Sequence, residues 1–472
     1  MLLDLSIREL QAGLAAKKFS SEDLVRKCYE NIAREQPRTN AFITIVDKET
    51  ALKEAKEKDA ARTPSAPPLY GIPFVLKDSF ATRGIRTTCA SNVLRDFIPP
   101  YDATVYRRLR EAGAILIGKM NMDAWGHGGS SENTDFGAVR NPWDIERVPG
   151  GSSGGCAAGV AVRMAAFAIG EDTGGSIRNP SAWCNTTGLK VTYGRVSRYG
   201  CVAYASSFDT VGPMGKSVED CAAILEATAG NDLHDATSAP VPVPSYTAEL
   251  AGAESFIKDK TIGVPRELFG EGLDPEIRAS IMASIDVLKG LGMQVKELSM
   301  PLFDYGLPVY YLIAPSETSS NLARYDGVRY GGDRSNFTEE TMRRIMIGTY
   351  ALSAGYYDAY YRKAQKARTL FIAEYKRLLS ECDVLVMPVN PTVAPKVGEL
   401  MADPLANLLA DVYTVSINPV GVPSLAVPSG FTKAGLPIGM QIVGKMFAES
   451  LLFQIGHAFQ SETDYHTRAP KV

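Results

Sequence analysis

The sequence has few of the residues that many enzymes use as bases or metal ligands. Its 472 residues include only four histidines, and none stands beside a glycine-flanked serine: they are His127, His234, His457 and His466. The seven cysteines are odd in number and show no C-x-x-C spacing, so we expect free thiols in a reducing cytosol and no metal site. No G-x-x-x-x-G-K-S/T motif occurs, which argues against ATP binding through a P-loop.

The chain also lacks a charge excess and a long apolar run. Its formal net charge is −3 and 22% of its residues are charged, which gives no reason to expect a nucleic-acid-binding face. No stretch reaches the length of a membrane span, and the first nine residues carry Asp4 and Glu9 in place of an apolar signal core. We therefore predict a cytoplasmic enzyme, with an organellar location left open, that has no membrane contact and no cofactor of its own.

What the chain does contain is a segment with two glycine-flanked serines. It opens with Gly150-Gly151-Ser152-Ser153-Gly154-Gly155, continues through an Ala/Val-rich run at 157–168, and closes with Asp172-Thr173-Gly174-Gly175-Ser176. We expect one apolar helix between the two serines. Glycine permits positive φ, so successive N–H groups can point into one concavity, as an oxyanion requires. The pattern favours a serine hydrolase, although a lone Gly-Gly-Ser is most often a turn.

A conventional nucleophile elbow does not fit this segment. The G-x-S-x-G pattern at 150–154 requires a buried strand before it, whereas residues 141–149 hold two prolines and three charged residues and are typical of a loop. A lysine can replace histidine as the base when burial lowers its pKa. Lys77 ends the apolar run 71–76, which has the composition of a buried strand. The alternative is an ordinary solvated lysine at a strand end.

Lys77, Ser152 and Ser176, with their glycine frames, resemble the amidase signature family, whose members hydrolyse amides with a Ser–Ser–Lys triad. The resemblance implies that Ser176 is the nucleophile and that Lys77 is the base. It implies that Ser152 bridges the two and follows a cis peptide bond from Gly151. For this chemistry Lys77 must be neutral at rest, and burial against residues 74–76 would have to make it so.

The same resemblance implies that an oxyanion hole is formed by the backbone N–H groups of Thr173, Gly174 and Gly175. Two departures from the family pattern lie near this loop. Glu171 stands where a small Ser or Thr is usual, and Trp183-Cys184-Asn185 replaces a pattern that ends in Gly. Neither departure removes an atom of the proposed triad.

Within the family, residues 310–330 and 348–361 are similar to the glutaminase (A) subunits of tRNA-dependent amidotransferases. Such subunits release ammonia from glutamine and pass it to a partner. The resemblance implies a heterotrimer with B and C subunits, in which charged tRNA binds mainly through the B subunit. ATP and Mg are expected on that partner, which converts Glu-tRNA(Gln) to Gln-tRNA(Gln) and in many organisms Asp-tRNA(Asn) to Asn-tRNA(Asn).

Glutamine is a zwitterion, and each of its charges is costly to bury unpaired. By resemblance, Arg344 binds the α-carboxylate, Asp411 binds the α-ammonium, and Tyr310 or Tyr311 lines the pocket. The alternative for Arg344 and Asp411 is an ordinary surface charge. Two other functions stay open: a stand-alone amidase acting on another small amide, and a catalytically idle scaffold that assembles such a complex.

The order of expected elements indicates an α/β fold. Capping patterns at Ser6–Glu9 and Ser20–Asp23 predict two helices, the second running to about residue 34, and 48–62 predicts a third. A strand at 72–77, a helix at 103–112 and a strand at 115–119 have the βαβ rhythm of a covered, largely parallel sheet. Later strands are predicted at 261–264, 383–387, 424–427 and 438–443.

The resemblance implies that these elements form a single α/β/α sandwich, with a mixed β-sheet between layers of α-helices. We treat residues 1–472 as one domain with four segments. These are the N-terminal helices (1–65), the catalytic core with the triad (66–225), an excursion with pocket helices (226–380) and the C-terminal strands that complete the sheet (381–472).

Overall fold

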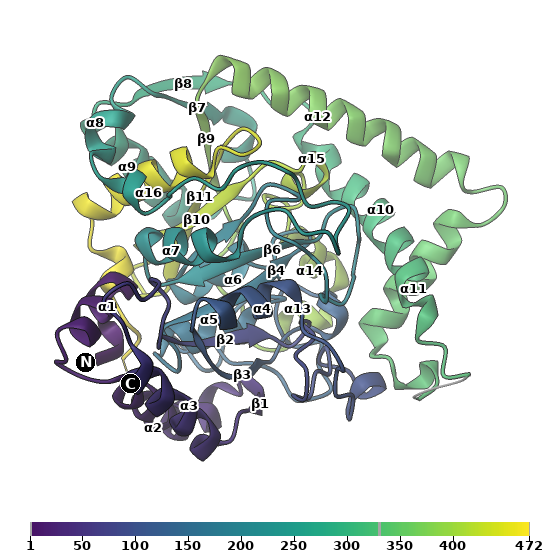
Figure 1. The fold of residues 1–472 in the computed structure, drawn as a ribbon. Helices are drawn as coiled ribbons and strands as arrows, with labels where there is room; N and C mark the ends of the chain where they lie inside the picture. Colours follow the sequence, from purple (N-terminus) through teal and green to yellow (C-terminus); the bar gives the residue numbers. More distant parts are fainter. Residues whose placement is uncertain (1, 329–331, 472) are drawn as a thin grey trace.

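The computed structural model describes residues 2–328 and 332–471, which form an 11-stranded mixed sheet with helices around it (Figure 1). The predicted α/β fold is therefore confirmed. Arg329 and Tyr330, at the end of the 310–330 segment, lie outside the described residues. The strands are β1 (Phe42–Ile45), β2 (Pro73–Lys77), β3 (Ile115–Met120), β4 (Phe167–Asp172), β5 (Thr187–Lys190), β6 (Thr210–Gly215), β7 (Thr261–Pro265), β8 (Gln294–Leu298), β9 (Val384–Pro388), β10 (Ser424–Phe431) and β11 (Pro437–Val443).

The strand order is β1-β3-β2-β4-β6-β5-β10-β11-β9-β7-β8. Strand β2 pairs in parallel with β3 and β4, and β7 pairs in parallel with β8 and β9. The pairs β1–β3, β4–β6, β5–β6, β5–β10, β10–β11 and β9–β11 are antiparallel. The expectation of a largely parallel sheet is therefore wrong. The βαβ unit formed by β2, α4 and β3 is present and pairs in parallel with β4, but the antiparallel pairs β1–β3 and β4–β6 join these strands to their other neighbours.

Helices cover both faces of this sheet. Their bounds are α1 (Ile7–Ala15), α2 (Ser21–Thr39), α3 (Lys48–Ala61), α4 (Thr104–Glu111), α5 (Gly154–Ala161), α6 (Arg178–Cys184), α7 (Val218–Thr228), α8 (Ala253–Ile257), α9 (Pro275–Gly290), α10 (Gly306–Asn321), α11 (Glu339–Leu352), α12 (Lys363–Glu381), α13 (Glu399–Ala402), α14 (Pro404–Leu409), α15 (Ile417–Val420) and α16 (Glu449–Glu462). Leu425 of β10 faces α16, while Gly439, opposite Pro428, faces α6. Positions 425 and 428 point to opposite sides of the strand.

The N-terminal helices follow their capping signals. Ser6 and Glu9 form a capping box at α1, and Ser20 and Asp23 form one at α2. Helix α2 continues past the predicted end, through Pro37 to Thr39, and stops at Asn40, which adopts the left-handed conformation. All four predicted segments contribute strands to the one sheet, and β1 lies within the segment expected to be helical.

The Ala/Val-rich run at 157–168 is not a single helix. Helix α5 ends at Ala161, Arg163 takes a φ of +62°, and the chain then enters strand β4 at Phe167. Every residue of β4 is buried between β2 and β6. Small apolar residues suit both a helix and a doubly covered strand, so the sequence pattern alone does not separate the two.

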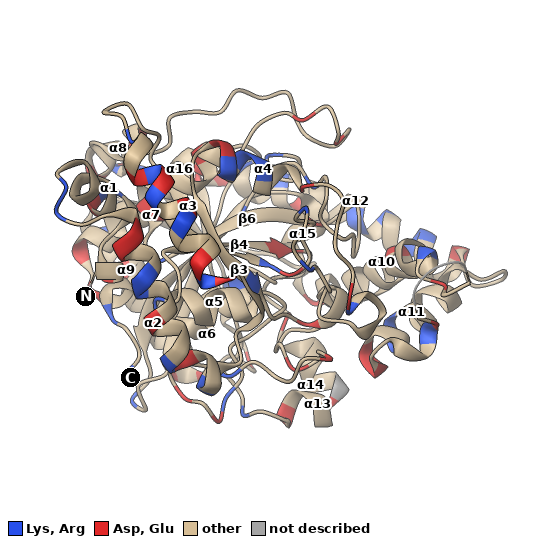
Figure 2. Cartoon of the chain, turned by 60° about the horizontal axis from the view of Figure 1, so that its bottom comes forward, with Lys and Arg blue, Asp and Glu red and all other residues tan. Residues whose placement is uncertain are grey.

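Helix α10 packs against both α11 and α12, and in Figure 1 α10 and α11 lie at the right while α12 runs back across the top toward β7. Figure 2 shows acidic and basic residues interspersed along helices such as α2, α3 and α9. Within the part of the chain that the structure describes, no helix is both long enough and apolar enough to cross a membrane.

Close contact between α10 and α11 generates a stability prediction. A Cβ on Gly348 of α11 would lie 1.9 Å from the backbone oxygen of Pro315 in α10. We expect Gly348→Ala to push the helices apart and to lower the free energy of unfolding by about 1–3 kcal/mol, as overpacking does. Thermal and urea unfolding would measure the loss.

The matched control is Gly290→Ala. Gly290 lies at the end of α9, and a Cβ there meets nothing within 4 Å. Because alanine favours a helix by up to about 1 kcal/mol over glycine, this variant should be as stable as the parent or slightly more so. Equal stability of the two variants would contradict the proposed helix contact.

Candidate active site

The carboxyl ends of two parallel strands bring the central charged residues together. In the β2–β4 pair, Leu76 is opposite Ile169, so the strands end side by side with Lys77 on β2 and Glu171 on β4. Clefts that bind ligands in open α/β sheets lie at such strand ends. Both side chains are buried.

The two predicted serines lie at this edge, each just before a helix. Ser152 follows a cis peptide bond from Gly151, as predicted, and precedes α5, while Ser176 precedes α6. The backbone N–H of Ser153 donates to the carbonyl oxygen of Ser176 at 3.1 Å, which joins the two loops. Lys77 Nζ donates to Ser152 Oγ at 2.7 Å. Ser152 is fully buried, whereas Ser176 keeps 7% of its surface exposed, so Ser176 is the serine nearer to solvent.

Glu171 changes the expected state of the lysine. Its Oε2 accepts a hydrogen bond from Lys77 Nζ at 2.8 Å, and its backbone oxygen accepts a second at 3.2 Å. Burial lowers the pKa of Lys77, but the charge and hydrogen bond of Glu171 outweigh burial and raise that pKa above its ordinary value. The expectation of a lysine kept neutral at rest by burial is therefore wrong for this chain, because the residue that replaces the usual Ser or Thr supplies a counter-charge.

The loop at 173–177 is held by a buried ion pair. Asp172 Oδ1 accepts from Arg178 Nη2 at 3.0 Å and from the Gly175 N–H at 2.9 Å, and Oδ2 accepts from the Ile177 N–H at 3.0 Å. Burial alone would raise the pKa of Asp172, but the guanidinium of Arg178 outweighs burial and holds that pKa below its ordinary value. Arg178 also donates to Asn418 at 2.7 Å, which ties the loop to the C-terminal part of the chain.

Two of the three predicted oxyanion donors keep an unengaged N–H. The Gly175 N–H is directed at Asp172, whereas no group among the described residues accepts from the backbone N–H of Thr173 or Gly174. Gly175 has a φ of +136°, which favours glycine. A Cβ on Gly174 would lie 2.5 Å from Cζ of Tyr310, so glycine there lets the tyrosine ring approach the loop. The oxyanion hole stays a prediction, carried mainly by Thr173 and Gly174.

The four predicted substrate residues gather beside this loop. Tyr311 donates to Asp411 Oδ2 at 2.8 Å, and the Arg344 guanidinium lies over the Tyr311 ring at 5.4 Å. The Tyr310 and Tyr311 rings meet edge to face at 5.0 Å. The four side chains therefore form one contact network, with Tyr310 toward Gly174 and Tyr311 in contact with both charged groups.

Asp411 and Arg344 differ in their surroundings. Asp411 is partly exposed, and burial raises its pKa to about 6, against the hydrogen bond from Tyr311 and the charge of Arg344. Arg344 is buried; its Nε donates to Glu340 at 2.8 Å and its Nη1 to the hydroxyl of Tyr204 at 2.7 Å. No described residue accepts from its Nη2. Neither residue is the ordinary surface charge that the sequence left as an alternative.

Thr414 links the pocket to the loop. Its hydroxyl is within hydrogen-bonding distance of the backbone oxygens of Gly174, at 2.6 Å, and of Asp411, at 3.0 Å. Tyr204 and Thr414 were not identified from the sequence, because Arg344 and Gly174, which they contact, lie far along the chain. Glu171 was noticed only as a departure from a family pattern.

Other candidate features make no hydrogen bond to Lys77, Ser152 or Ser176 among the described residues, although His127 packs edge to face against Tyr204 at 4.6 Å. His127 is buried with its ring nitrogens beside the hydroxyls of Thr318 and Thr341, and burial holds its pKa well below the ordinary value. All seven cysteines are unpaired. Within residues 2–328 and 332–471, no cluster of three His, Cys, Asp or Glu side chains could hold a metal ion.

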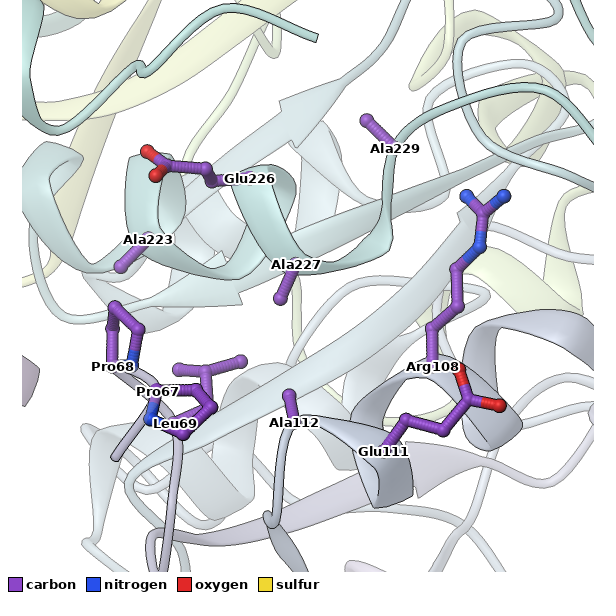
Figure 3. Close-up of a pocket in the computed structure, with 10 residues that line it drawn as sticks. All are labelled: Pro67, Pro68, Leu69, Arg108, Glu111, Ala112, Ala223, Glu226, Ala227 and Ala229. Atoms are coloured by element: carbon purple, nitrogen blue, oxygen red, sulfur yellow. The ribbon is translucent and has the colours of Figure 1, made fainter. Parts of the chain in front are cut away.

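A surface pocket between α4 and α7 (Figure 3) shares no lining residue with the site. Its volume is about 530 Å³, and it is lined mainly by alanine and proline, with Arg108, Glu111 and Glu226 at its edges. Arg108 already donates to the backbone oxygens of Thr228 and Asn231, both at 2.7 Å. Its guanidinium is thus used to hold the chain that follows α7.

Comparison with known proteins finds relatives that match this chain over nearly its whole length. The family model described as Amidase matches residues 23–453. The A subunit of the glutamyl-tRNA(Gln) amidotransferase of Moorella thermoacetica is 50% identical over 99% of this chain and 98% of its own. The crystal structure of the protein of that name from Thermotoga maritima has a TM-score of 0.84 at 37% identity, covering 100% of this chain and 98% of its own. The peptide amidase of Stenotrophomonas maltophilia has a TM-score of 0.81 at 30% identity, covering 99% and 97%.

The Asp172–Arg178 pair predicts a large loss of stability when one partner is removed. We expect Arg178→Met to lower the free energy of unfolding by about 3–5 kcal/mol, because the Asp172 carboxylate is left buried without its counter-charge. The double variant Asp172→Asn/Arg178→Met should lose less than Arg178→Met alone. Urea unfolding followed by circular dichroism would measure both.

The control is Arg362→Met, which removes an exposed partner of Asp358 at 3.1 Å. Exposed pairs contribute about 0–1 kcal/mol, so this variant should stay close to the parent. If Arg178→Met changed stability as little as Arg362→Met, the buried pair would not hold the loop.

Proposed function

Because this chain belongs to the amidase family, we propose that it is the glutaminase component of a tRNA-dependent amidotransferase. It hydrolyses glutamine and supplies the ammonia to a partner chain. The observation that carries the proposal is the hydrogen bond of 2.7 Å from Lys77 to Ser152, at a site where the Asp411 carboxylate and the Arg344 guanidinium both contact Tyr311.

Ser176 is the proposed nucleophile. Its hydroxyl attacks the side-chain amide carbon of glutamine, and its proton passes to Ser152 while the proton of Ser152 passes to a deprotonated Lys77. The N–H groups of Thr173 and Gly174 stabilise the negative charge that develops on the amide oxygen. Collapse returns a proton to the departing nitrogen, releases ammonia and leaves a glutamyl ester on Ser176, which water then hydrolyses.

The pocket supports glutamine as the substrate. Asp411 is partly exposed and negatively charged above a pH of about 6, which suits an α-ammonium. Arg344 keeps an unengaged Nη2 among the described residues, which suits an α-carboxylate. Arg344 lies over the Tyr311 ring and Asp411 accepts from the Tyr311 hydroxyl, so a cation and an anion flank one side chain, which suits two opposite charges borne by a single α-carbon.

The B and C subunits of such an enzyme are the proposed partners, in a cytoplasmic heterotrimer. The relatives from Moorella thermoacetica and Thermotoga maritima are named as A subunits of glutamyl-tRNA(Gln) amidotransferase. The interspersed surface charge (Figure 2) and the net charge of −3 favour charged tRNA binding mainly through the B subunit. ATP and Mg are proposed to bind to that partner, which activates and amidates Glu-tRNA(Gln) or Asp-tRNA(Asn).

Stand-alone hydrolysis of another amide is the second candidate, and the similarity to a peptide amidase supports it. Full activity without partners would distinguish it. An idle scaffold is disfavoured because Lys77, Ser152 and Ser176 are all retained at one site.

Ser176→Ala should abolish ammonia release from glutamine. We expect kcat to fall by at least about a thousandfold, because binding and oxyanion stabilisation alone give little rate. With partner subunits present, the variant should still amidate charged tRNA when ammonium is supplied, since amidation occurs on another chain. Glutamate dehydrogenase-coupled assays and tRNA acylation gels would measure the two activities.

The matched control is Ser181→Ala. Ser181 is a buried serine of α6, and its hydroxyl makes no hydrogen bond among the described residues. It should hydrolyse glutamine at the parental rate. Near-parental hydrolysis by Ser176→Ala would refute the triad, and loss of both activities would favour a single-site enzyme.

Asp411→Asn should raise the KM for glutamine by about thirtyfold or more, because a lost buried charge partner costs about 2–5 kcal/mol. In the parent enzyme, KM should rise as the pH falls through about 6, since the raised pKa of Asp411 means that its charge is lost there. In Asp411→Asn this pH dependence should disappear. Steady-state kinetics across that range would measure both effects.

Asp403→Asn is the control, because Asp403 caps the exposed helix α14 and asparagine caps a helix equally well. Its KM should match the parent at every pH. An unchanged KM in Asp411→Asn would contradict the glutamine pocket and leave the stand-alone amidase as the better proposal.

A further inference from the structure

The contacts of Lys77 Nζ fit an ammonium group. Within the described residues, Nζ is directed at three acceptors: Ser152 Oγ at 2.7 Å, the backbone oxygen of Glu171 at 3.2 Å and Glu171 Oε2 at 2.8 Å. An ammonium has three N–H donors and no acceptor, so these contacts satisfy the charged form. A base that takes the proton of Ser152 must instead present a lone pair to Ser152 Oγ. Lys77 Nζ must therefore lose one proton before it can act as the base.

A second carboxyl group lies behind Glu171. The Thr173 hydroxyl is within hydrogen-bonding distance of Glu171 Oε1 and of Asp209 Oδ1, the latter at 2.8 Å. A hydroxyl has one proton, so it can donate to only one of them, and the other must donate to it. One of the two carboxyl groups therefore carries a proton.

We assign the proton to Asp209, because it has no ion-pair partner among the described residues whereas Glu171 pairs with Lys77; its oxygens also accept from the backbone N–H groups of Tyr204 and Ala205, both at 3.0 Å. Burial, followed by the neighbouring charge of Glu171, raises its pKa to about 8. Glu171 in turn has the lysine as its counter-ion. The buried cluster then holds an ammonium on Lys77, a carboxylate on Glu171 and a neutral acid on Asp209. It is electrically neutral as a whole, which limits the cost of burying it.

Other titratable groups around Lys77 do not provide a second counter-charge. Cys156 of α5 and the loop residue Cys89 are buried and the loop residue Cys201 is partly buried, and burial raises the pKa of each thiol, to about 12 for Cys156. Asp123 is also buried, and burial raises its pKa to about 7, but it accepts its hydrogen bonds from the N–H groups of Ser131 and Asn133. Among the described residues, Glu171 is the one carboxylate paired with Lys77.

We propose that Glu171 is a positioning residue that keeps Lys77 protonated in the resting enzyme and thereby sets the pH at which the base becomes available. The proton on Nζ is lost to solvent water or hydroxide as the pH rises, and the neutral amine then accepts the proton of Ser152. This inference rests on the proposed function, because it takes Lys77 as the base. It differs from the pattern that the family resemblance implies, in which a small hydroxyl residue stands at this position.

The test is the pH dependence of the reaction of Ser176 with a fluorophosphonate, a probe that needs an activated serine but no glutamine. Glu171→Gln and Glu171→Ser should each lower the midpoint of the rising limb by at least about one pH unit, because burial without a counter-charge lowers a lysine pKa by up to about 3–5 units. The rising limb in the pH profile of kcat/KM for glutamine should shift to lower pH in the same variants. A loss of packing alone would change the rate without moving the midpoint.

Two further variants sharpen the test. Asp209 makes no contact with Lys77 Nζ, whereas Glu171 Oε2 lies 2.8 Å from it, so Asp209→Asn should move the midpoint less than Glu171→Gln does. Glu35→Gln alters a buried glutamate of α2 that pairs with Arg34 at 2.6 Å and Arg38 at 3.0 Å, away from the site, and should not move it.

A smaller or upward shift in both Glu171 variants, or loss of labelling at every pH in folded protein, would overturn the inference. So would a shift in Asp209→Asn as large as that in Glu171→Gln. If neither Glu171 variant folds, the unmodified protein provides the test. Its labelling rate should rise above neutral pH, and a plateau reached below neutrality would overturn the inference.

Labelling without glutamine hydrolysis would refute the substrate proposal alone, whereas no labelling of the unmodified protein at any pH would refute both proposals.

Discussion

The parallel pairing of β2 with β4 is the constraint on which the site depends. It ends both strands at one buried edge and sets Lys77 against Glu171 at 2.8 Å. A lysine in such a place needs a counter-charge or must lose its proton, and β4 provides the counter-charge. The serine loops that precede α5 and α6 then close over the same edge, so the strand register decides which groups can exchange protons.

A second buried pair extends this arrangement to the substrate pocket. Asp172 follows Glu171 on β4, holds the 173–177 loop through two N–H groups, and pairs with Arg178. Arg178 reaches Asn418, and Thr414 bridges Gly174 and Asp411. A shift of the C-terminal segment would therefore move the pocket and the oxyanion loop together. These direct contacts place Asp411, the proposed substrate-binding residue, next to the loop that carries the proposed nucleophile.

Much of the site could be predicted from the sequence, because the triad and oxyanion residues lie in two short glycine motifs and one strand end. The cis bond at Gly151–Ser152 and the gathering of Arg344, Asp411, Tyr310 and Tyr311 also agree with the resemblance. The first residues of strand β4 were expected to be helical, because small apolar residues suit either element. The charge state of Lys77 could not be predicted, since it depends on a cross-strand contact that no spacing in the sequence reveals. Asp209 and Tyr204 lie in an irregular loop without a recognisable motif.

The central claim is that Ser176 forms a covalent ester with the side-chain acyl group of glutamine. Rapid acid quenching of the enzyme during turnover, followed by peptide mass spectrometry, tests it most directly. We predict a glutamyl adduct on the peptide that contains Ser176 and none on the peptide that contains Ser152. An adduct on Ser152 or on a cysteine, or ammonia release in a single turnover without any adduct, would contradict the account.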